Sequence, residues 1–486
     1  MCSNTLRSLF NDVFLEMMIT PLDDRRNTHQ QCQAYAPENT VFRINLSQKN
    51  TKIKLLVQSL ILINSLSMAS SGYAAESLEQ AWSQALSRNH VFLASQQKEQ
   101  AANHQLSAAR ANYLPKISLD SGYLKTETEP AAKLNISSIP FLQGLALPFA
   151  QDSAYFGAVS VTAPIFTGGK ISNGVAAAQS LSEATQANTE LTRSDLKLAI
   201  AQSYINVLRA QHASTVANSY VDSVTRHVSD VRNLSDQGYV AKHDLLASEV
   251  ALANAQQLQL QANNAVELAN AAYNRWMGRD FVQTVDLIDL STQETPAQPG
   301  DLVSLLQSAD RQRKELQALN KQGDAYRQQA ASINAGQLPQ LGLNAGYGKL
   351  DNRYLAQDKG WWVGIVMSWN LFDGGLTRHQ ASQLSANAAA VREMEADTRE
   401  KVALQVRQAW LSYQEAQARI HVAGKATAQA DETLKLARER YRSGLGPNSE
   451  VLDAETRRVQ AYSNRDNAIY DCEFARLQLQ YAAGQL

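Results

Sequence analysis

The sequence "LPKISLDSGY" at residues 114–123 returns as "LPQLGLNAGY" at residues 338–347, 224 positions later. In the first copy the apolar residues Ile117, Leu119 and Tyr123 alternate with polar ones, and the second copy keeps this alternation. A period of two indicates a strand with one apolar and one polar face. The recurrence of such a segment predicts an internal duplication of the chain.

A second pair of segments repeats at a different spacing. The segment "VSVTAPIFTGG" at 159–169 matches "IVMSWNLFDGG" at 365–375, an offset of 206 residues. The two offsets differ by 18, which predicts an insertion in the first half, within residues 133–150. We expect this insertion to form a longer extracellular loop. The predicted strands cover residues 113–126, 154–167, 338–350 and 360–372.

Long segments with few helix-breaking residues follow both strand pairs. No Gly or Pro occurs from Val175 to Gln237, and residues 376–443 contain one Gly and no Pro. We predict long helices at 171–237 and 376–443, each about 100 Å long at 1.5 Å per residue, which implies coiled-coil packing. Gly238 and Gly444 are the predicted hairpin turns, because glycine suits helix termination. Helices at 240–278 and 448–483 follow these turns, and a single helix precedes each first strand, within 76–112 and 301–337.

The N-terminal region predicts export. Three lysines precede an apolar run from Leu55 to Leu66 and then small residues, the pattern of a signal peptide at 49–75 with cleavage near Ala74 or Ala75. Residues 1–48 are expected to be a spurious extension from a misplaced start codon. The first repeat then spans 76–292, a linker 293–300, and the second repeat 301–486.

Several features of the strands point to a membrane. They are about ten residues long, which suits a tilted strand that crosses a bilayer. Aromatic residues gather near the strand ends, as in the interfacial girdles of membrane barrels. The residues predicted for this membrane interface are Tyr123, Tyr155, Phe156, Tyr347, Trp361 and Trp362.

Four strands cannot close a barrel, and open sheet edges are not tolerated in lipid. The subunit must therefore associate with copies of itself. A dimer would supply eight strands, whose interior fills with side chains, whereas the twelve strands of a homotrimer leave room for a water-filled passage.

Composition and motifs argue against other classes of function. The formal net charge of −1 excludes a strongly basic surface, so no nucleic-acid partner is expected. The eight histidines show no HExxH spacing, and no two of the three cysteines have metal or redox spacing. The "TGGKI" segment lacks the earlier Gly and the Ser or Thr of a phosphate-binding loop. We therefore predict no catalytic residues, no cofactor, no metal site and no enzymatic activity.

These features together resemble the TolC-like outer-membrane efflux family. The resemblance rests on the twin "LPKISL" and "LPQLGL" segments, on "APIFTGGK" and "NLFDGG" before the long helices, and on "YRSGLGPNSEVLDAE" at 441–455, and it covers residues 76–486. It implies a trimer with a twelve-stranded barrel in the outer membrane and an α-helical tunnel in the periplasm of a Gram-negative bacterium. It also implies a passive exit duct that works with a periplasmic adaptor and an inner-membrane RND, ABC or MFS transporter.

The resemblance further implies a periplasmic gate at the tunnel tip. Asp244 and Glu450 lie six residues after the two hairpin glycines, and Asp453 lies three further on. Together with Tyr441 they match the family's acidic and tyrosine gate positions. The family's basic partner falls on Gly446, so the resemblance implies that this salt bridge is missing here. A weaker closed state, or a lock built differently, is the resulting hypothesis.

Two alternatives stay open from the sequence. The acidic residues could serve the helix dipole, with Asn448 or Ser449 capping the helix after Pro447. The chain could also be an exported coiled-coil structural or adhesive protein without channel activity, although that class leaves the repeated strand pairs unexplained. Drug efflux and type I protein secretion both stay open within the exit-duct hypothesis, and the absence of a Cys after the apolar run, where a lipid anchor would attach, slightly favours the secretion branch.

Overall fold

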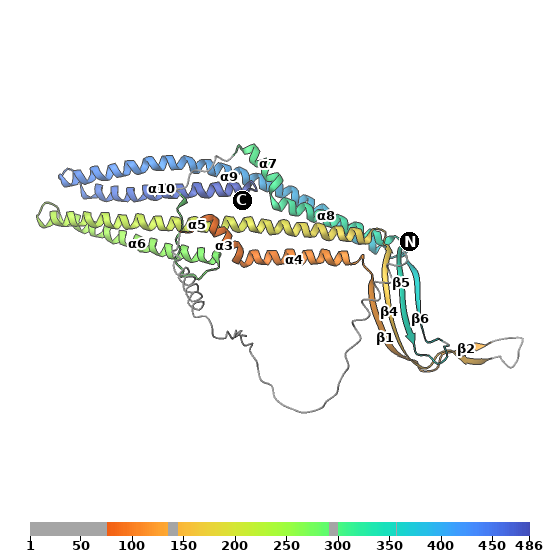
Figure 1. Cartoon of the computed structure of the whole chain (residues 1–486). Coiled ribbons are helices and arrows are strands. Elements are labelled where there is room, and N and C mark those ends of the chain that lie inside the picture. The colour runs from red at the N-terminus through yellow and green to blue at the C-terminus, as the bar shows by residue number, and fades with distance from the viewer. Residues whose placement is uncertain (1–74, 135–143, 291–299, 356) are drawn as a thin grey trace, which may run out of the picture. The chain divides into compact units, whose positions relative to one another are not determined.

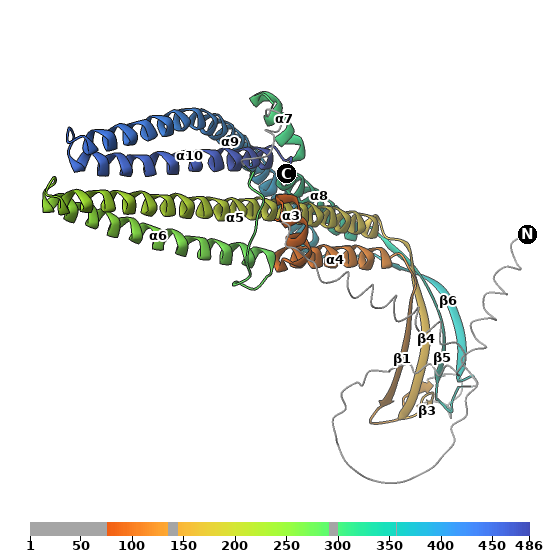
Figure 2. The same cartoon turned by 60° about the vertical axis from the view of Figure 1, so that its left-hand side comes forward.

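The computed structural model describes residues 75–134, 144–290, 300–355 and 357–486. The predicted extension, the signal peptide up to residue 74, the centre of the insertion and nearly all of the linker lie outside these ranges. Within them, long helices run side by side and a curved sheet joins their ends (Figures 1 and 2). No helix in the described ranges is both long enough and apolar enough to cross a membrane.

Two helices of 67 residues each organise the helical part, α5 (Lys170–Asp236) and α9 (Leu376–Arg442). Two shorter helices pack along each of them, so that a long helix is covered in succession by two partners. Along α5 these are α4 (His90–Ala111) and α6 (Lys242–Met277). Along α9 they are α8 (Lys314–Asn334) and α10 (Asn448–Ala482). The two halves contact each other where α8 and α10 pack against α5.

The helix before each strand pair is broken, which corrects the prediction of single helices there. In the first half α3 (Leu78–Arg88) ends at Asn89, whose side chain accepts from the backbone N–H groups of Val91 and Phe92 and so starts α4. In the second half α7 (Leu302–Gln312) ends at Arg313, where α8 starts, and the short 3-10 helix η3 (Ala335–Gln337) follows α8. Both junction residues are extended, with ψ of 120° and 123°. An extended residue within a helical run ends one helix and lets the next begin in a new direction.

The main sheet is antiparallel and has the strand order β1-β4-β5-β6. Its strands are β1 (Lys116–Lys125), β4 (Ser153–Phe166), β5 (Gln340–Leu350) and β6 (Lys359–Ser368). The middle pair, β4 with β5, joins the two halves of the duplication. The last strand ends at Ser368, four residues before the predicted boundary at 372.

One face of this sheet is apolar along every strand. Residues paired in register lie on the same face, and the paired residues Leu119 with Val159, Val159 with Tyr347, and Tyr347 with Trp361 carry that face across the sheet. The face remains open to the surroundings of the single chain, since Ile117 is 74% and Trp361 is 77% exposed. Its members are Ile117, Leu119, Tyr123, Tyr155, Val159, Val161, Leu343, Tyr347, Trp361, Val363, Ile365 and Met367.

The opposite face is polar and rich in glycine. Ser118 and Ser160 hydroxyls lie 2.9 Å apart, and Asn344 donates to the Thr162 hydroxyl at 3.1 Å. The indole N–H of Trp362 donates to Asn344 at 2.7 Å while its ring lies over Gly346, where any Cβ would come within 2.3 Å of the ring.

The polar face also carries two of the residues that the sequence predicts for the membrane interface. Phe156 packs over Gly122 and pairs with it in register, so it lies on the polar face together with Trp362. Neither residue shares the apolar face that carries Tyr123, Tyr155, Tyr347 and Trp361.

Two short strands form a second sheet at the two ends of the insertion, on either side of residues 135–143, which lie outside the described ranges. Strand β2 (Ala131–Leu134) pairs with β3 (Leu145–Pro148) in antiparallel register. Beside it, the Glu129 carboxylate accepts from the Tyr354 hydroxyl at 2.9 Å and pairs with Arg353. The hairpin is therefore held against the loop between β5 and β6.

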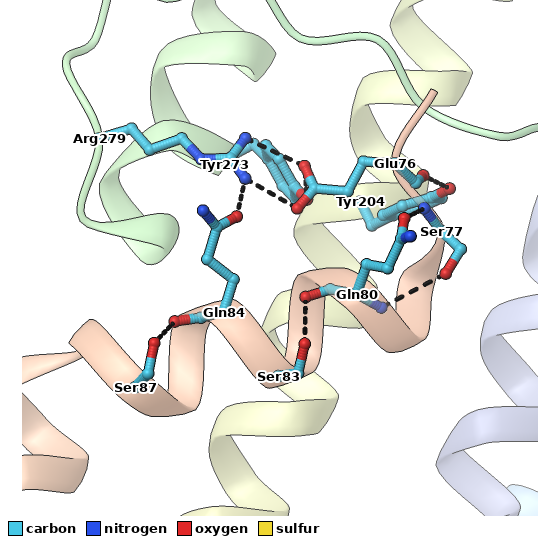
Figure 3. A network of polar contacts seen from close by, with 9 residues as sticks. All are labelled: Glu76, Ser77, Gln80, Ser83, Gln84, Ser87, Tyr204, Tyr273 and Arg279. Atoms are coloured by element: carbon cyan, nitrogen blue, oxygen red, sulfur yellow. Dashed lines mark hydrogen bonds and ion pairs between the residues drawn. The ribbon is translucent and has the colours of Figure 1, made fainter. Parts of the chain in front are cut away.

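A buried polar network fixes the start of α3 against the rest of the helices (Figure 3). Arg279 makes a two-pronged ion pair with Glu76, with nitrogen to oxygen distances of 2.8 and 3.0 Å. The Tyr273 hydroxyl donates to the same carboxylate at 3.1 Å, and the Tyr204 hydroxyl lies 2.8 Å from the Glu76 carbonyl. Both tyrosine side chains are fully buried, and this burial raises the pKa of each hydroxyl, so both stay protonated donors.

This network predicts a large cost for removing its cation. Arg279→Met leaves the Glu76 carboxylate, whose side chain is 14% exposed, without its ion partner. Loss of one partner from a buried pair should lower the free energy of unfolding by roughly 3 kcal/mol. Thermal unfolding of the detergent-purified protein, followed by circular dichroism, measures the change. Arg275→Met is the control: the side chain of this exposed residue in the last turn of α6 lies over the Trp276 ring, so its loss should cost less than about 1 kcal/mol.

Candidate functional site at the tips of the helical hairpins

The α5–α6 and α9–α10 hairpins turn at the end of the helices that lies away from the sheet (Figure 1). Gly238 and Gly444 sit at these turns with φ of +74° and +71°, a left-handed conformation that favours glycine. In each turn a backbone N–H bonds back across the helix end, from Tyr239 to the Leu234 carbonyl and from Leu445 to the Arg440 carbonyl. The two turns are therefore built alike.

The predicted gate carboxylates lie in the first turns that follow. Asp244 is half-buried in the first turn of α6, and Glu450 is exposed in the first turn of α10. Asp453 is exposed one turn further along α10. Acidic residues at these positions also interact favourably with the helix dipole, so the two interpretations are compatible in this structure.

The Arg440 side chain lies in the space above Gly446, within the same hairpin as Glu450, and the absence of the family's salt bridge at position 446 stays a prediction. A Cβ at Gly446 would lie 3.2 Å from the Arg440 Cβ and 3.0 Å from a Glu450 carboxylate oxygen. The Arg440 Nε lies 3.4 Å from that oxygen, with both side chains about half exposed. The charge beside Glu450 thus comes from the last turn of α9. Because the pair is exposed, it contributes little to stability.

Tyr441 points into the subunit and is only 7% exposed. Its ring meets the His227 ring edge-on, with the centroids 5.5 Å apart. Burial first, and then the charge of Asp244, raises the pKa of its hydroxyl. Among the described residues that hydroxyl has no hydrogen-bond partner. Within one subunit Tyr441 therefore acts as a packing residue between the two hairpins.

Asn448 connects the hairpins, a role that the sequence analysis missed. The N-cap of α10 is Pro447 and no side chain caps this helix, so the predicted cap by Asn448 or Ser449 is wrong. The Asn448 side chain is 3% exposed and accepts from His227 Nε2 at 2.7 Å. Its amide nitrogen donates to the Ser248 hydroxyl at 2.9 Å and to the Asp244 carbonyl at 3.0 Å. One side chain from α10 thereby binds both helices of the other hairpin.

A buried ion pair lies one layer deeper. Arg438 on α9 pairs with Glu455 on α10, whose side chain is 1% exposed. The Ser223 hydroxyl on α5 donates to Glu455 at 3.0 Å and accepts from Arg438 at 2.6 Å. On the surface Arg442 and Asp230 form a further link between the hairpins at 2.8 Å. Polar contacts between the hairpins therefore occur at three levels.

At the other end of the molecule, four predicted interface aromatics lie in two cross-strand pairs on the apolar face of the sheet. Tyr123 pairs with Tyr155, their ring centroids 4.8 Å apart, and Tyr347 pairs with Trp361. All four are more than half exposed in the single chain. Rings that combine an apolar body with a polar tip suit the boundary between lipid and water.

No group of three or more His, Cys, Asp or Glu side chains within the described residues is arranged to hold a metal ion. Cys472 is buried in the helical core, and burial raises the pKa of its thiol, so it is an unreactive packing residue.

Comparison with known proteins identifies a family and a fold. The family model described as outer membrane efflux protein matches residues 81–279 and 305–485. The chain is 23% identical over 427 residues to the outer membrane protein TolC of Vibrio cholerae, covering 86% of this chain and 92% of that protein. It is 27% identical over 305 residues to the alkaline protease secretion protein AprF of Pseudomonas aeruginosa, covering 60% of this chain and 62% of that protein. The solved structure of the outer-membrane channel OprN has the same fold, with a TM-score of 0.71, 21% identity, and coverage of 84% of this chain and 90% of that one.

The tip geometry yields a prediction for Tyr441. Tyr441→Phe removes a buried hydroxyl that has no partner in the described subunit, so it should leave the thermal midpoint unchanged or slightly higher. Tyr441→Ala removes the ring between the hairpins and should cost about 3 kcal/mol. Thermal unfolding distinguishes the two variants, with Tyr239→Ala, at a residue that is 76% exposed, as the control. An equal loss in Tyr441→Phe and Tyr441→Ala would show that the hydroxyl is bonded in the assembly.

Proposed function

The chain belongs to the outer membrane efflux protein family, and we propose that it acts as a homotrimeric exit duct in which three subunits close one barrel and one helical tunnel. The protein is an outer-membrane channel of the efflux and secretion class, with its helices in the periplasm. We also propose that the tunnel narrows at the hairpin tips and that a periplasmic adaptor docks with the duct there.

The single observation that carries the trimer is the sheet. Its apolar face suits lipid, its opposite face carries hydroxyl and amide groups together with glycines, and its outer strands are β1 and β6. Among the described residues neither outer strand has a partner on its free side. In lipid every backbone N–H and C=O must be bonded within protein, so β1 of one copy must meet β6 of the next. Three copies give twelve strands, enough for a water-filled lumen lined by the polar face.

The alternative hypothesis, an exported coiled-coil protein without channel activity, does not account for this sheet. Such a protein has no use for a four-stranded sheet whose apolar face is open along its whole length. Large exposed apolar patches in water lead to association or aggregation. The channel class places this face in contact with lipid.

The narrow end of the duct is proposed to lie at the hairpin tips. Asp244, Glu450 and Asp453 would each occur three times around the axis and attract cations to the opening. Substrate would arrive from an inner-membrane RND, ABC or MFS transporter through a periplasmic adaptor that contacts the hairpins. Energy would come from that transporter, so this chain needs no catalytic residues of its own.

The proposed trimer is tested by mass and by conductance. The purified mature chain in detergent should have the mass of three protein chains by light scattering, and it should insert into planar bilayers and conduct ions. The result follows from the need to cover both sheet edges. A monomeric chain that is soluble without detergent would contradict both the trimer and the channel.

The acidic ring is tested by cation block. Asp453→Ala should weaken block by a trivalent cation, added on the side of the hairpin tips, by about tenfold, which corresponds to roughly 1.4 kcal/mol. Glu450→Ala should act in the same direction and also release Arg440. Single-channel recordings give the blocking constant. Glu432→Ala, an exposed carboxylate near Lys435 on α9, is the matched control and should leave block unchanged.

A further inference from the structure

The contact between Asn448 and the other hairpin uses three of the four hydrogen-bonding positions that a side-chain amide offers. The oxygen accepts from His227 Nε2, and the nitrogen donates to Ser248 and to the Asp244 carbonyl. Ser248 in turn donates to the Asp244 carbonyl at 2.9 Å. The four residues come from α5, α6 and α10, so the network exists only while the two hairpins touch.

The surroundings of this network are apolar. Val231 and Val451 are fully buried close by, in a cluster that also holds Leu434 and Ala437. Polar groups in such a place are costly unless they are bonded. Separation of the hairpins without water entry would leave several groups unpaired, whereas separation with water entry would satisfy them. The network is therefore stable in two arrangements, closed and hydrated, and unfavourable between them.

We propose that Asn448, His227 and Ser248 form a latch that holds the α9–α10 hairpin against the α5–α6 hairpin in the closed tip, and that release of this latch widens the duct. The proposal rests on the proposed function, because it assigns a regulatory role to residues at the tip of that duct. The latch replaces a bridge between charged side chains with a neutral amide buried inside each subunit.

Among the contacts at the tip, we expect the latch to contribute most to the closed state, because its residues are the most deeply buried. The Arg440–Glu450 and Arg442–Asp230 pairs are each about half exposed, and such pairs contribute little. His227, Ser248 and Asn448 are 4%, 0% and 3% exposed. A buried hydrogen bond is worth more, and its loss leaves an unsatisfied partner. The deeper Arg438–Glu455 pair sits within the α9–α10 hairpin and reaches the other hairpin only through Ser223.

His227 makes the latch sensitive to pH. It is buried among groups from every neighbouring element: Asp230 on its own helix, Arg438 and Tyr441 on α9, Glu455 and Asn448 on α10, and Ser248 with the Asp244 backbone on α6. Burial is the largest effect and lowers the pKa of the imidazole, Arg438 adds to this, and the bond to Asn448 with the charges of Glu455 and Asp230 opposes it. The closed latch thus prefers the neutral ring.

The sign of the pH effect follows from this preference. In an open, hydrated tip the histidine titrates near its ordinary value of 6.5, above its pKa in the closed latch. The full stability of the latch is present above that ordinary value and decreases as the pH falls from there towards the lowered pKa. Mild acid should therefore open the tip, and neutral pH should keep it closed.

The first test removes the latch amide. In planar bilayers at neutral pH, Asn448→Ala should shift the ratio of open to closed channels by about tenfold towards open, because at least one buried hydrogen bond between the hairpins is lost. Asn464→Ala is the matched control, since Asn464 is exposed on the same helix and bonds only within it. Light scattering of each variant verifies that the trimer is intact.

The second test separates titration from hydrogen bonding. His227→Gln keeps an N–H donor for Asn448 but cannot gain a proton between pH 7 and pH 5. Wild-type conductance should rise over that range, while the conductance of His227→Gln should stay flat. His243→Gln, an exposed histidine at the same tip, should retain the wild-type pH profile.

A third test replaces the hydrogen bond between Asn448 and Ser248 with a covalent bond that can be made and broken reversibly. Ser248→Cys with Asn448→Cys, in a Cys472→Ala background, introduces one thiol on α6 and one on α10, at two positions whose wild-type side chains are in direct hydrogen-bond contact. The reduced protein should be open and the oxidised protein closed, and reduction should restore conductance. An oxidised channel as open as the reduced one would overturn the latch.

The outcomes distinguish failure of the latch from failure of the proposed function. A wild-type chain that forms no conducting trimer refutes the exit duct itself. A conducting wild-type trimer whose Asn448→Ala variant assembles and keeps wild-type conductance refutes the latch and leaves the duct intact. Equal pH profiles for wild type and His227→Gln refute the role of His227.

Discussion

In the described part of the chain the outer edges of β1 and β6 pair with no further strand, and this constraint determines the assembly that we propose. The four-stranded sheet is complete within one subunit except at these two edges, and its apolar face has no cover from the described part of the chain. In water the face would cause aggregation, and in lipid the edges would each lose many hydrogen bonds. A closed ring of subunits removes both problems together. The helices continue directly from the strands, so closure of the ring also fixes where their far ends meet.

Because of the duplication, the two halves of one subunit share the same layout of a broken leading helix, a long helix and a hairpin turn. Asn89 and Arg313, at which the leading helices break, are 224 positions apart, the same offset as the first strands. The long helices have equal lengths, and each hairpin turns at a left-handed glycine. The halves differ in detail, however. The Asn89 side chain caps α4, whereas Arg313 is buried, pairs with Glu315 and donates to the Tyr481 carbonyl. Equivalent backbone positions have thus acquired different supporting contacts.

Much of the architecture follows from local signals in the sequence. Alternation of apolar and polar residues predicts each strand of the main sheet and its faces, and the absence of Gly and Pro predicts the long helices. Proximity to the strand ends predicts Phe156 and Trp362 at the interface, but the side of the sheet on which a residue lies depends on register. Each of the two rings sits above a glycine on the polar face. The small strands β2 and β3 were missed because they are only four residues long.

The contacts at the tip join residues that are far apart in the sequence, so local sequence patterns do not predict them. An Asn after Pro at the start of a helix is a good N-cap candidate, yet the partners of Asn448 are His227 and Ser248, 221 and 200 residues away along the chain. Only the packing of the two hairpins reveals that contact. In the same way, the sequence shows that position 446 is Gly, but only the structure shows that the Arg440 side chain lies over it.

The balance between buried and exposed contacts at the tip also bears on what the duct can respond to. Exposed ion pairs such as Arg442–Asp230 weaken in salt, because dissolved ions reach and screen charges at the surface. A neutral amide network inside the subunit has no net charge for ions to screen. Its one titratable member, His227, changes charge with proton concentration alone. A tip held mainly by Asn448 therefore keeps its closed state across a wide range of salt and yields to acid, whereas a tip held by an exposed salt bridge would respond to both.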